Sequence, residues 1–189
     1  MISPTIAAAD LWAVWLIGWL ISARATAKTV REQPGSSLLA YSLFTWSGAL
    51  LVFFHPIGPN VLLRPLLPDK IWISWTGVGL VVVGLGFSGW ARLHLGRLWS
   101  GRVTLKENHE IVRSGPYTFV RHPIYTGLVL AIVGTALTQI TLAAIAGLVL
   151  ATIGLMIKIR QEERLLTEHF GATYESYQRN VRALIPYVW

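Results

Sequence analysis

Long runs of apolar residues alternate with shorter polar stretches along this chain. Residues 6–23 form the first run, which is broken only by Asp10, and residues 38–54 and 71–91 form two further runs without any charge. Residues 123–157 form a fourth run, again uncharged. A helix of about 20 apolar residues crosses the hydrocarbon core of a bilayer, which is ~30 Å thick. The pattern therefore predicts an all-α integral membrane protein.

The fourth run is too long for one crossing, because about 34 helical residues at ~1.5 Å each extend to roughly 50 Å. The polar residues Thr138, Gln139 and Thr141 lie near its middle. We therefore expect a helical hairpin, with helices near residues 124–137 and 140–160 and a tight turn at Gln139. One long core helix is the alternative interpretation.

Together the runs predict five transmembrane helices in a single membrane domain, residues 1–189. Residues 1–91 would hold three of them, and residues 92–189 would hold the hairpin of residues 123–160. The tail is expected to continue as an amphipathic helix, which Gly171 is expected to interrupt. Apolar and aromatic side chains recur there at spacings of three and four, which places them on one helical face; they are Leu166, Phe170, Tyr174, Tyr177 and Val181.

Lysine and arginine are distributed unevenly between the two ends of the predicted helices. Residues 24–37, 92–121 and 158–182 fall on one side and contain fourteen of the sixteen Lys and Arg residues. Such a bias places the basic side in the cytoplasm. The amino terminus is then outside, and the carboxyl terminus and the polar segment before the hairpin are cytoplasmic. The bias also accounts for the net charge of +7 without a nucleic-acid partner.

The composition narrows the possible chemistry. Hydrophobic residues make up 53% of the chain and charged residues 13%. Nine tryptophans are present, and this residue favours the membrane interface. We interpret His94, Arg97 and Trp99, which follow the third run, as an interfacial anchor. The absence of cysteine excludes thiol nucleophiles, disulfides and thiolate metal sites. No HExxH spacing, Walker loop or GxGxxG after a strand is present, so neither a metal site nor a soluble dinucleotide fold is predicted.

A polar segment, SGPYTFVRHPIYTG, leads into the predicted hairpin. Pro123 is expected in the first turn of the helix, where proline is favoured. Arg121 and His122 then lie at the amino end of that helix, where free N–H groups and the helix dipole favour an anion. Tyr125 follows within the first turn. A bound anionic group is one interpretation, and side chains that reach the lipid headgroups are the other.

Charged residues also gather at the cytoplasmic end of the last predicted crossing. Lys158 and Glu162 are four residues apart and share a helical face. Glu162 and Glu163 are adjacent and point about 100° apart, so at most one of them is expected to face a given pocket. Acids are unfavourable at the carboxyl end of a helix dipole, so their presence indicates a partner such as a cationic ligand. A solvated charged tail is the alternative.

Two segments together resemble a known family. The run GRLWS…HEIVRSGPYTFVRHPIYTG begins at Gly96 and is followed by the paired acids in EERLLTEHFGATYESYQRNVRALIP. The combination resembles the isoprenylcysteine carboxyl methyltransferase family, and more broadly the integral membrane methyltransferases that include phospholipid N-methyltransferases. The resemblance covers residues 92–187, whereas the first two apolar runs match the family only in being apolar.

The resemblance implies a membrane enzyme that binds S-adenosylmethionine and methylates a lipidic or prenylcysteine-like carboxylate. Glu162 would secure the cationic part of the cofactor, and Lys158 or Arg160 would orient the anionic head of the substrate. The family has an arginine one turn before the acid, and Lys158 keeps its charge but not its bidentate fork. The cofactor-binding residues that the resemblance implies are His109, Ile111, Val112, Tyr117, His122, Pro123, Tyr125 and Glu162.

Other functions are compatible with the same residues. A phospholipid or amine N-methyltransferase would need a base to accept the proton of the nucleophile, and Glu162, Glu163 or His122 could serve. An NADPH-dependent membrane reductase with a similar carboxyl-terminal half is a further alternative, as is a non-catalytic membrane protein. A transporter is disfavoured, because the predicted crossings lack ionisable residues near the middle of the membrane.

Overall fold

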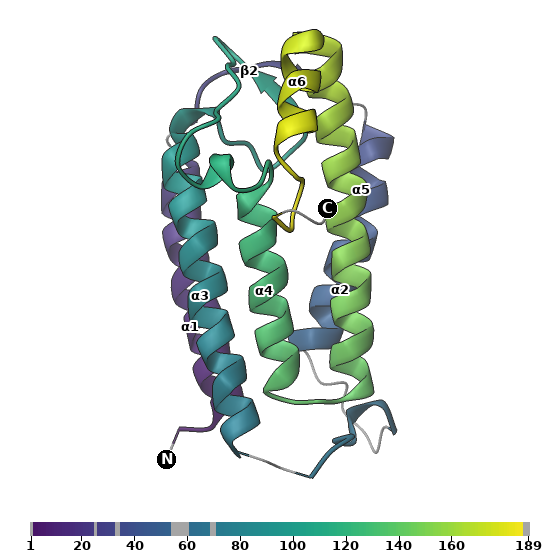
Figure 1. The fold of residues 1–189 in the computed structure, drawn as a ribbon. Helices are drawn as coiled ribbons and strands as arrows, with labels where there is room; N and C mark the ends of the chain where they lie inside the picture. Colours follow the sequence, from purple (N-terminus) through teal and green to yellow (C-terminus); the bar gives the residue numbers. More distant parts are fainter. Residues whose placement is uncertain (1, 25, 33–34, 54–60, 69–70, 187–189) are drawn as a thin grey trace.

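The computed structural model describes the chain except for residues 1, 25, 33–34, 54–60, 69–70 and 187–189. Long helices lie side by side with roughly parallel axes, and β2 and α6 lie at one end of the bundle (Figure 1). The α-helices of the described residues are α1 (Pro4–Ala23), α2 (Gly35–Phe53), α3 (Ile71–Leu95), α4 (Pro123–Leu137), α5 (Leu142–Phe170) and α6 (Ala172–Asn180). Short 3₁₀ helices are η1 (Val61–Leu63), η2 (Gly96–Leu98) and η3 (Gly115–Thr118).

The prediction of an all-α fold is wrong in one detail, because two short strands pair near the polar end. β1 (Thr29–Glu32) lies between α1 and α2, and β2 (Thr104–Lys106) follows α3. The strands are antiparallel, with Glu32 opposite Thr104. The isolated segments are too short to show a strand pattern, and only the packing of α1 beside α3 brings them together.

Glycines allow the helices to approach closely in two pairs. α3 packs along α4, where a Cβ added at Gly84 would lie 2.6 Å from the backbone nitrogen of Ala131. α2 packs along α5 in the same way, and a Cβ at Gly48 would lie 2.6 Å from the carbonyl oxygen of Gly147. Because side chains would separate the backbones, glycine at these positions determines the spacing of the bundle.

The hairpin predicted for the last apolar run is confirmed. α4 ends at Leu137, Ile140 has a φ of +48°, and the Thr141 side chain caps α5 by accepting a 3.1 Å hydrogen bond from the N–H of Ala144. The Gln139 side chain anchors the turn, because it donates to the carbonyl of Val52 at 2.9 Å. The second helix of the hairpin, however, continues beyond residue 160 as far as Phe170.

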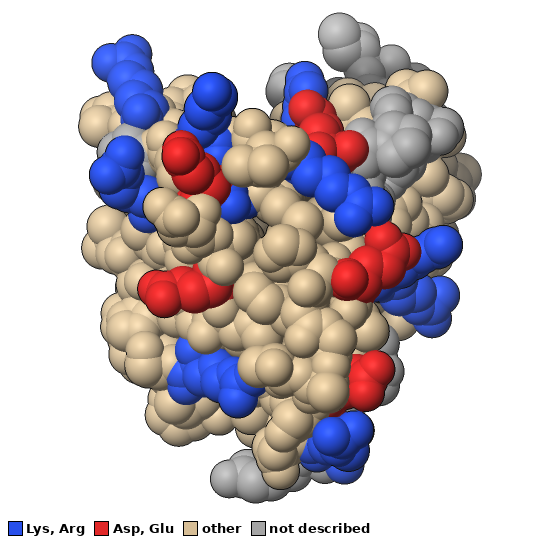
Figure 2. All heavy atoms as spheres, turned by 90° about the horizontal axis from the view of Figure 1, so that it is seen from above, with Lys and Arg blue, Asp and Glu red and all other residues tan. Residues whose placement is uncertain are grey.

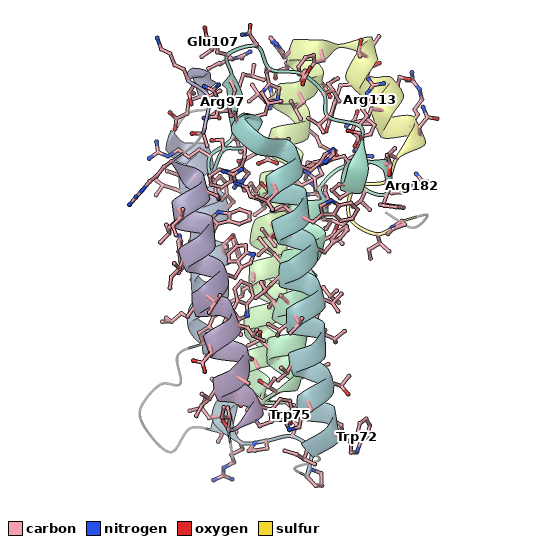
Figure 3. The ribbon with its side chains drawn as sticks, turned by 90° about the vertical axis from the view of Figure 1, so that its left-hand side faces the viewer. Trp72, Trp75, Arg97, Glu107, Arg113 and Arg182 are labelled. Carbon is pink, nitrogen blue, oxygen red and sulfur yellow. The ribbon has the colours of Figure 1, made fainter. Side chains whose placement is uncertain are left out.

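Three helices are long and apolar enough to cross a membrane in the described part of the chain: Pro4–Ala23, Ile71–Leu98 and Leu142–Phe170. Leu38–Phe53 and Pro123–Leu137 are shorter apolar helices. Figure 3 shows Trp72 and Trp75 at one end of the bundle and Arg97 and Arg113 at the other, as the two interfaces of a membrane protein require. The protein is thus integral to the membrane, while five crossings and their orientation stay predictions.

The tail folds back over the polar end. Gly171, with a φ of +52°, separates α5 from α6 as predicted, and Tyr174 and Tyr177 are buried. The chain after α6 then pairs with the segment that enters α4, where the backbone N–H of Arg121 donates to the carbonyl of Arg182 at 2.8 Å. Viewed from above, Lys and Arg side chains surround this end of the bundle with acidic side chains among them (Figure 2).

Candidate active site

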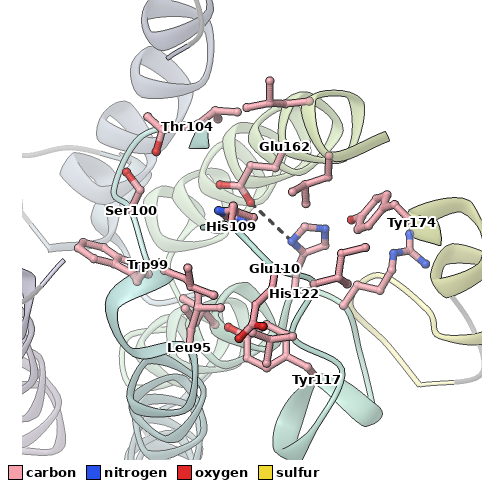
Figure 4. A pocket seen from close by; sticks show the side chains of 18 of the residues that line it. Leu95, Trp99, Ser100, Thr104, His109, Glu110, Tyr117, His122, Glu162 and Tyr174 are labelled. Atoms are coloured by element: carbon pink, nitrogen blue, oxygen red, sulfur yellow. Dashed lines mark ion pairs between the residues drawn. The ribbon is translucent and has the colours of Figure 1, made fainter. Parts of the chain in front are cut away.

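A cavity of about 860 Å³, part of it open to solvent, lies at the polar end of the bundle (Figure 4). Its wall is formed by the segment after α3, by η3, by the first turn of α4, and by parts of α5 and α6. Most residues implied in cofactor binding line the cavity: His109, Ile111, Val112, Tyr117, His122, Tyr125 and Glu162.

The first turn of α4 supplies the polar side of the cavity. Pro123 is the first residue of α4, as predicted, and it is buried behind the cavity lining. His122 precedes it, and its ring lies parallel to that of Tyr125, with centroids 5.7 Å apart. Because Tyr125 follows within one turn, both side chains reach the same part of α5. The start of this helix therefore orients two polar groups toward one acid.

That acid is Glu162, whose carboxylate faces the cavity. The Tyr125 hydroxyl donates to it at 2.6 Å, and His122 Nδ1 lies 3.6 Å from its other oxygen (Figure 4). Within the described residues, His122 is its only ion-pair partner. Glu162 thus presents a negative charge to the cavity that no Lys or Arg of the described chain neutralises directly.

The neighbouring Glu163 points elsewhere, as the helical spacing predicts. Its carboxylate accepts hydrogen bonds from Arg121 Nε at 2.8 Å and Gln178 Nε2 at 3.3 Å, and it lies 3.1 Å from His122 Nε2. Arg121 also donates to the backbone carbonyls of Gln178 and Val181. This cluster connects α5, the start of α4 and the tail, so Arg121 acts here as a structural residue.

His109 approaches the cavity in its neutral form. Its Nδ1 accepts a 3.2 Å hydrogen bond from the backbone N–H of Lys106, which leaves the proton on Nε2. Burial lowers the pKa of His109, and electrostatic interactions with His169 and Lys106 lower it further, against a smaller opposing effect of Glu110. At neutral pH this ring is therefore an uncharged donor.

Two tyrosines contribute shape rather than acid–base chemistry. The Tyr117 hydroxyl donates to the carbonyl of Ala91 at 3.4 Å, and the Tyr177 hydroxyl donates to the carbonyl of Tyr117 at 2.6 Å. Burial is the main cause that raises the pKa of Tyr117, and it raises the pKa of Tyr177 to about 12. Both hydroxyls stay protonated, and their rings form the wall of the cavity.

Lys158 and Arg160 do not line the cavity. Lys158 Nζ donates to the carbonyl of Gly101 at 2.7 Å and lies 5.4 Å from the ring centroid of Tyr125. Arg160 is exposed, because it lies two residues further and thus on the opposite side of the helix. Their assignment to substrate binding stays a prediction that this geometry does not favour.

Part of the lining escaped the sequence analysis: Trp99, Ser100, Arg102, Thr104, Glu110 and Tyr174 also line the cavity. Trp99 was expected to be an interfacial anchor. The buried guanidinium of Arg92 lies 4.4 Å from the centroid of its ring and is held by the carbonyls of Ser22 and Gly96. The carboxyl ends of α1 and α3 thus position Trp99. The spacing of residues along the sequence does not reveal this contact between distant segments.

Residues 77–168 match the model of the isoprenylcysteine carboxyl methyltransferase (ICMT) family. The matched residues make up just under half of this chain. The resemblance predicted from the motifs is thereby confirmed, and the matched residues begin within α3 and continue beyond the paired acids of α5. None of the described residues forms a cluster of three or more metal-binding side chains.

Named relatives agree with the family match. Protein-S-isoprenylcysteine O-methyltransferase B of Arabidopsis thaliana is 29% identical over 143 residues, which cover 74% of this chain and 73% of the relative. Methanethiol S-methyltransferase 1 of Bradyrhizobium diazoefficiens is 28% identical, with 94% of this chain and 65% of the relative covered. The enzyme class predicted from the sequence, a methyltransferase, is confirmed by the family and by these relatives.

A solved structure shares the fold. The eukaryotic intramembrane Ras methyltransferase ICMT matches with a TM-score of 0.58 and 25% identity over 81% of this chain. This chain spans half the length of that structure's chain. The fold and the family therefore agree for the core that carries the cavity.

Proposed function

We propose that this protein is an S-adenosylmethionine-dependent integral membrane methyltransferase and that the cavity holds the cofactor. The observation that carries the proposal is the Glu162 carboxylate, which faces the cavity with His122 as its only ion-pair partner among the described residues. A cationic ligand group would complete this partly buried charge, because a buried charge is stable only when it is paired. S-adenosylmethionine carries two such groups, a sulfonium and an ammonium.

The remaining lining fits the rest of the cofactor. Apolar and aromatic side chains also line the cavity, among them Leu95, Trp99 and Val112. Such walls suit a flat, uncharged ring such as adenine. His109 offers its neutral Nε2–H as a donor to an oxygen or ring nitrogen. The cavity therefore combines the Glu162 carboxylate with apolar walls in one space.

The chain would contribute to the reaction mainly by positioning. S-adenosylmethionine, when bound, supplies an already electrophilic methyl group, so no covalent enzyme intermediate is needed. Glu162, aimed by Tyr125 and His122, would fix the charged end of the cofactor relative to the methyl acceptor. Correct alignment of two reactants can contribute roughly 7–11 kcal/mol to lowering a barrier.

The methyl acceptor is proposed to be a lipidic or prenylcysteine-like molecule that enters from the bilayer. The Arabidopsis relative is named for an isoprenylcysteine substrate, and the Bradyrhizobium relative for a thiol. A carboxylate acceptor is ionised at neutral pH and needs no base, whereas an amine or thiol must lose a proton. Glu162 is the residue placed to accept such a proton, so a phospholipid or amine acceptor is the second candidate.

The topology belongs to the proposal as well. We propose five crossings, with the amino terminus outside and the cavity in the cytoplasm, where soluble cofactor is available. Arg97 and Arg113 lie at the cavity end of the bundle and Trp72 and Trp75 at the other (Figure 3), which agrees with the rule that basic residues stay inside.

Titration of the purified protein with S-adenosylhomocysteine and with NADPH tests the proposed function. We expect saturable binding of S-adenosylhomocysteine and none of NADPH. Binding of NADPH alone would instead support a membrane reductase, and binding of neither would support a non-catalytic membrane protein. Mass spectrometry of native lipids for a methyl group that depends on the protein would then identify the acceptor.

A further inference from the structure

We propose that Arg102 binds the acidic group of the methyl acceptor at the mouth of the cavity. The inference rests on the proposed function, and it names the residue that selects an acceptor with a carboxylate. Arg102 precedes β2, and its neighbours Ser100 and Thr104 lie along one side of the cavity in Figure 4.

The arginines that line the cavity in the described chain are Arg102 and Arg121, and Arg121 is not available for a ligand. Its side chain is 10% exposed, and its guanidinium pairs with Glu163 and with two backbone carbonyls. Turning it toward a substrate would leave the Glu163 carboxylate partly buried without its strongest partner. Such a loss is costly, because a buried charge must be paired.

Lys158, the cation expected in this role, is also engaged elsewhere. Its ammonium donates to the carbonyl of Gly101 and lies over the rings of Tyr41 and Tyr125, outside the lining of the cavity. The contact with Gly101 nevertheless has a consequence, since it attaches the loop next to Arg102 to α5. Lys158 thus holds the position of the neighbouring arginine.

Arg102, in contrast, has a partner that it can readily exchange. Its NH1 lies 2.8 Å from a carboxylate oxygen of Glu32, and the two side chains are 62% and 45% exposed. An ion pair between exposed side chains contributes little stability, because water screens it. A substrate carboxylate can therefore replace Glu32, and the guanidinium fork binds a carboxylate through two parallel hydrogen bonds.

The β1–β2 pair explains why Glu32 is close. Glu32 lies opposite Thr104 in the antiparallel register, and Arg102 precedes Thr104 by two residues. Glu32 then competes with the substrate for the same guanidinium. Removal of the Glu32 charge should consequently strengthen substrate binding, an effect that a merely structural ion pair would not produce.

Binding of two probes to the protein saturated with S-adenosylhomocysteine tests the inference. The probes are N-acetyl-S-farnesylcysteine, which carries a carboxylate, and its carboxamide, which does not. We expect Arg102→Gln to weaken binding of the carboxylate probe at least tenfold and to leave the carboxamide unchanged, and Glu32→Gln to strengthen binding of the carboxylate probe. Arg31→Gln is the matched control. Arg31 lies next to Glu32 on β1, pairs with the exposed Glu168 and does not line the cavity.

S-adenosylhomocysteine binding is measured first, so that failure of the proposed function is recognised separately. If the cofactor product binds, the inference is overturned by any of three results: no preference of the wild type for the carboxylate probe, equal effects of Arg102→Gln on both probes, or weaker carboxylate binding in Glu32→Gln. Repetition in nanodiscs with and without anionic lipid excludes a headgroup ligand. An effect of Arg102→Gln that appears only with anionic lipid would also overturn the inference.

Discussion

The hydroxyl of Tyr125 donates a 2.6 Å hydrogen bond to the carboxylate of Glu162, and this contact joins the first turn of α4 to the polar end of α5. The ring of Tyr125 is also packed against His122, so the hydroxyl has little freedom to move. The carboxylate is thereby aimed into the cavity. The proposed cofactor site depends on this aim, because its charge must meet a cationic group at a defined place.

Tyr125→Phe should weaken binding of S-adenosylhomocysteine about tenfold. The change removes one hydrogen bond to a charged group, with a net value of about 1.5 kcal/mol at the lower end of its range, and keeps the ring. Tyr41→Phe is the control, because Tyr41 contacts Lys158 from another helix and does not line the cavity. Equal affinities of the two variants, measured by calorimetry, would show that the hydroxyl does not orient the site.

Glu163→Gln should lower the free energy of unfolding by more than it lowers the free energy of ligand binding. The change leaves the guanidinium of Arg121 partly buried without its charged partner, which costs about 3–5 kcal/mol for buried pairs. Glu168→Gln, which affects the exposed pairs with Arg31 and Arg164, should cost less than about 1 kcal/mol. Thermal unfolding in detergent should rank the variants in this order, and similar midpoints would argue against a structural role of the Glu163 cluster.

Gly127→Ala should separate α3 from α4 and destabilise the protein by about 1–3 kcal/mol, the usual cost of overpacking. A Cβ at this position would lie 2.6 Å from the backbone nitrogen of Ser88, and a backbone atom cannot move aside. Gly86→Ala is the matched control in α3, since no heavy atom lies within 4 Å of a Cβ placed there. Yield and unfolding temperature should fall for the first variant alone; unaltered stability of Gly127→Ala would contradict the close packing.

The stability of the protein should decrease as the pH falls below the ordinary His109 pKa of 6.5. Burial lowers the pKa of His109 in the folded protein, so at such pH the unfolded chain binds a proton that the folded chain does not. Stability therefore rises with pH in this window and is fully present above it. His109→Asn, which keeps an acceptor for the N–H of Lys106, should show a smaller loss of unfolding temperature between pH 7.5 and 5.5. Identical pH profiles of the two proteins would refute the assignment.

The features that sequence predicted well are those fixed by neighbouring residues. Pro123 begins α4, a turn at Gln139 divides the last apolar run, and Gly171 interrupts the tail. Glu162 and Glu163 diverge because successive helical residues point about 100° apart. Each of these follows from backbone geometry over a few positions, which a single sequence contains.

The features that were missed depend on contacts between distant segments. β1 and β2 are separated by all of α2 and α3, and neither strand has a pattern of its own. The role of Trp99 depends on Arg92 and on the carbonyl of Ser22, which approaches only when α1 packs beside α3. Likewise, the spacing of Lys158 and Glu162 placed both on one face, but it could not show that Lys158 would bind the carbonyl of Gly101 instead of facing the cavity.

The most direct measurement of the central claim is the affinity of the Glu162→Ala variant for S-adenosylhomocysteine. Loss of the carboxylate should weaken binding at least tenfold relative to the wild type, whereas Glu175→Ala, an exposed acid of α6, should bind as the wild type does. Unchanged affinity of a folded Glu162→Ala protein would contradict the proposal that this cavity binds the cofactor through Glu162.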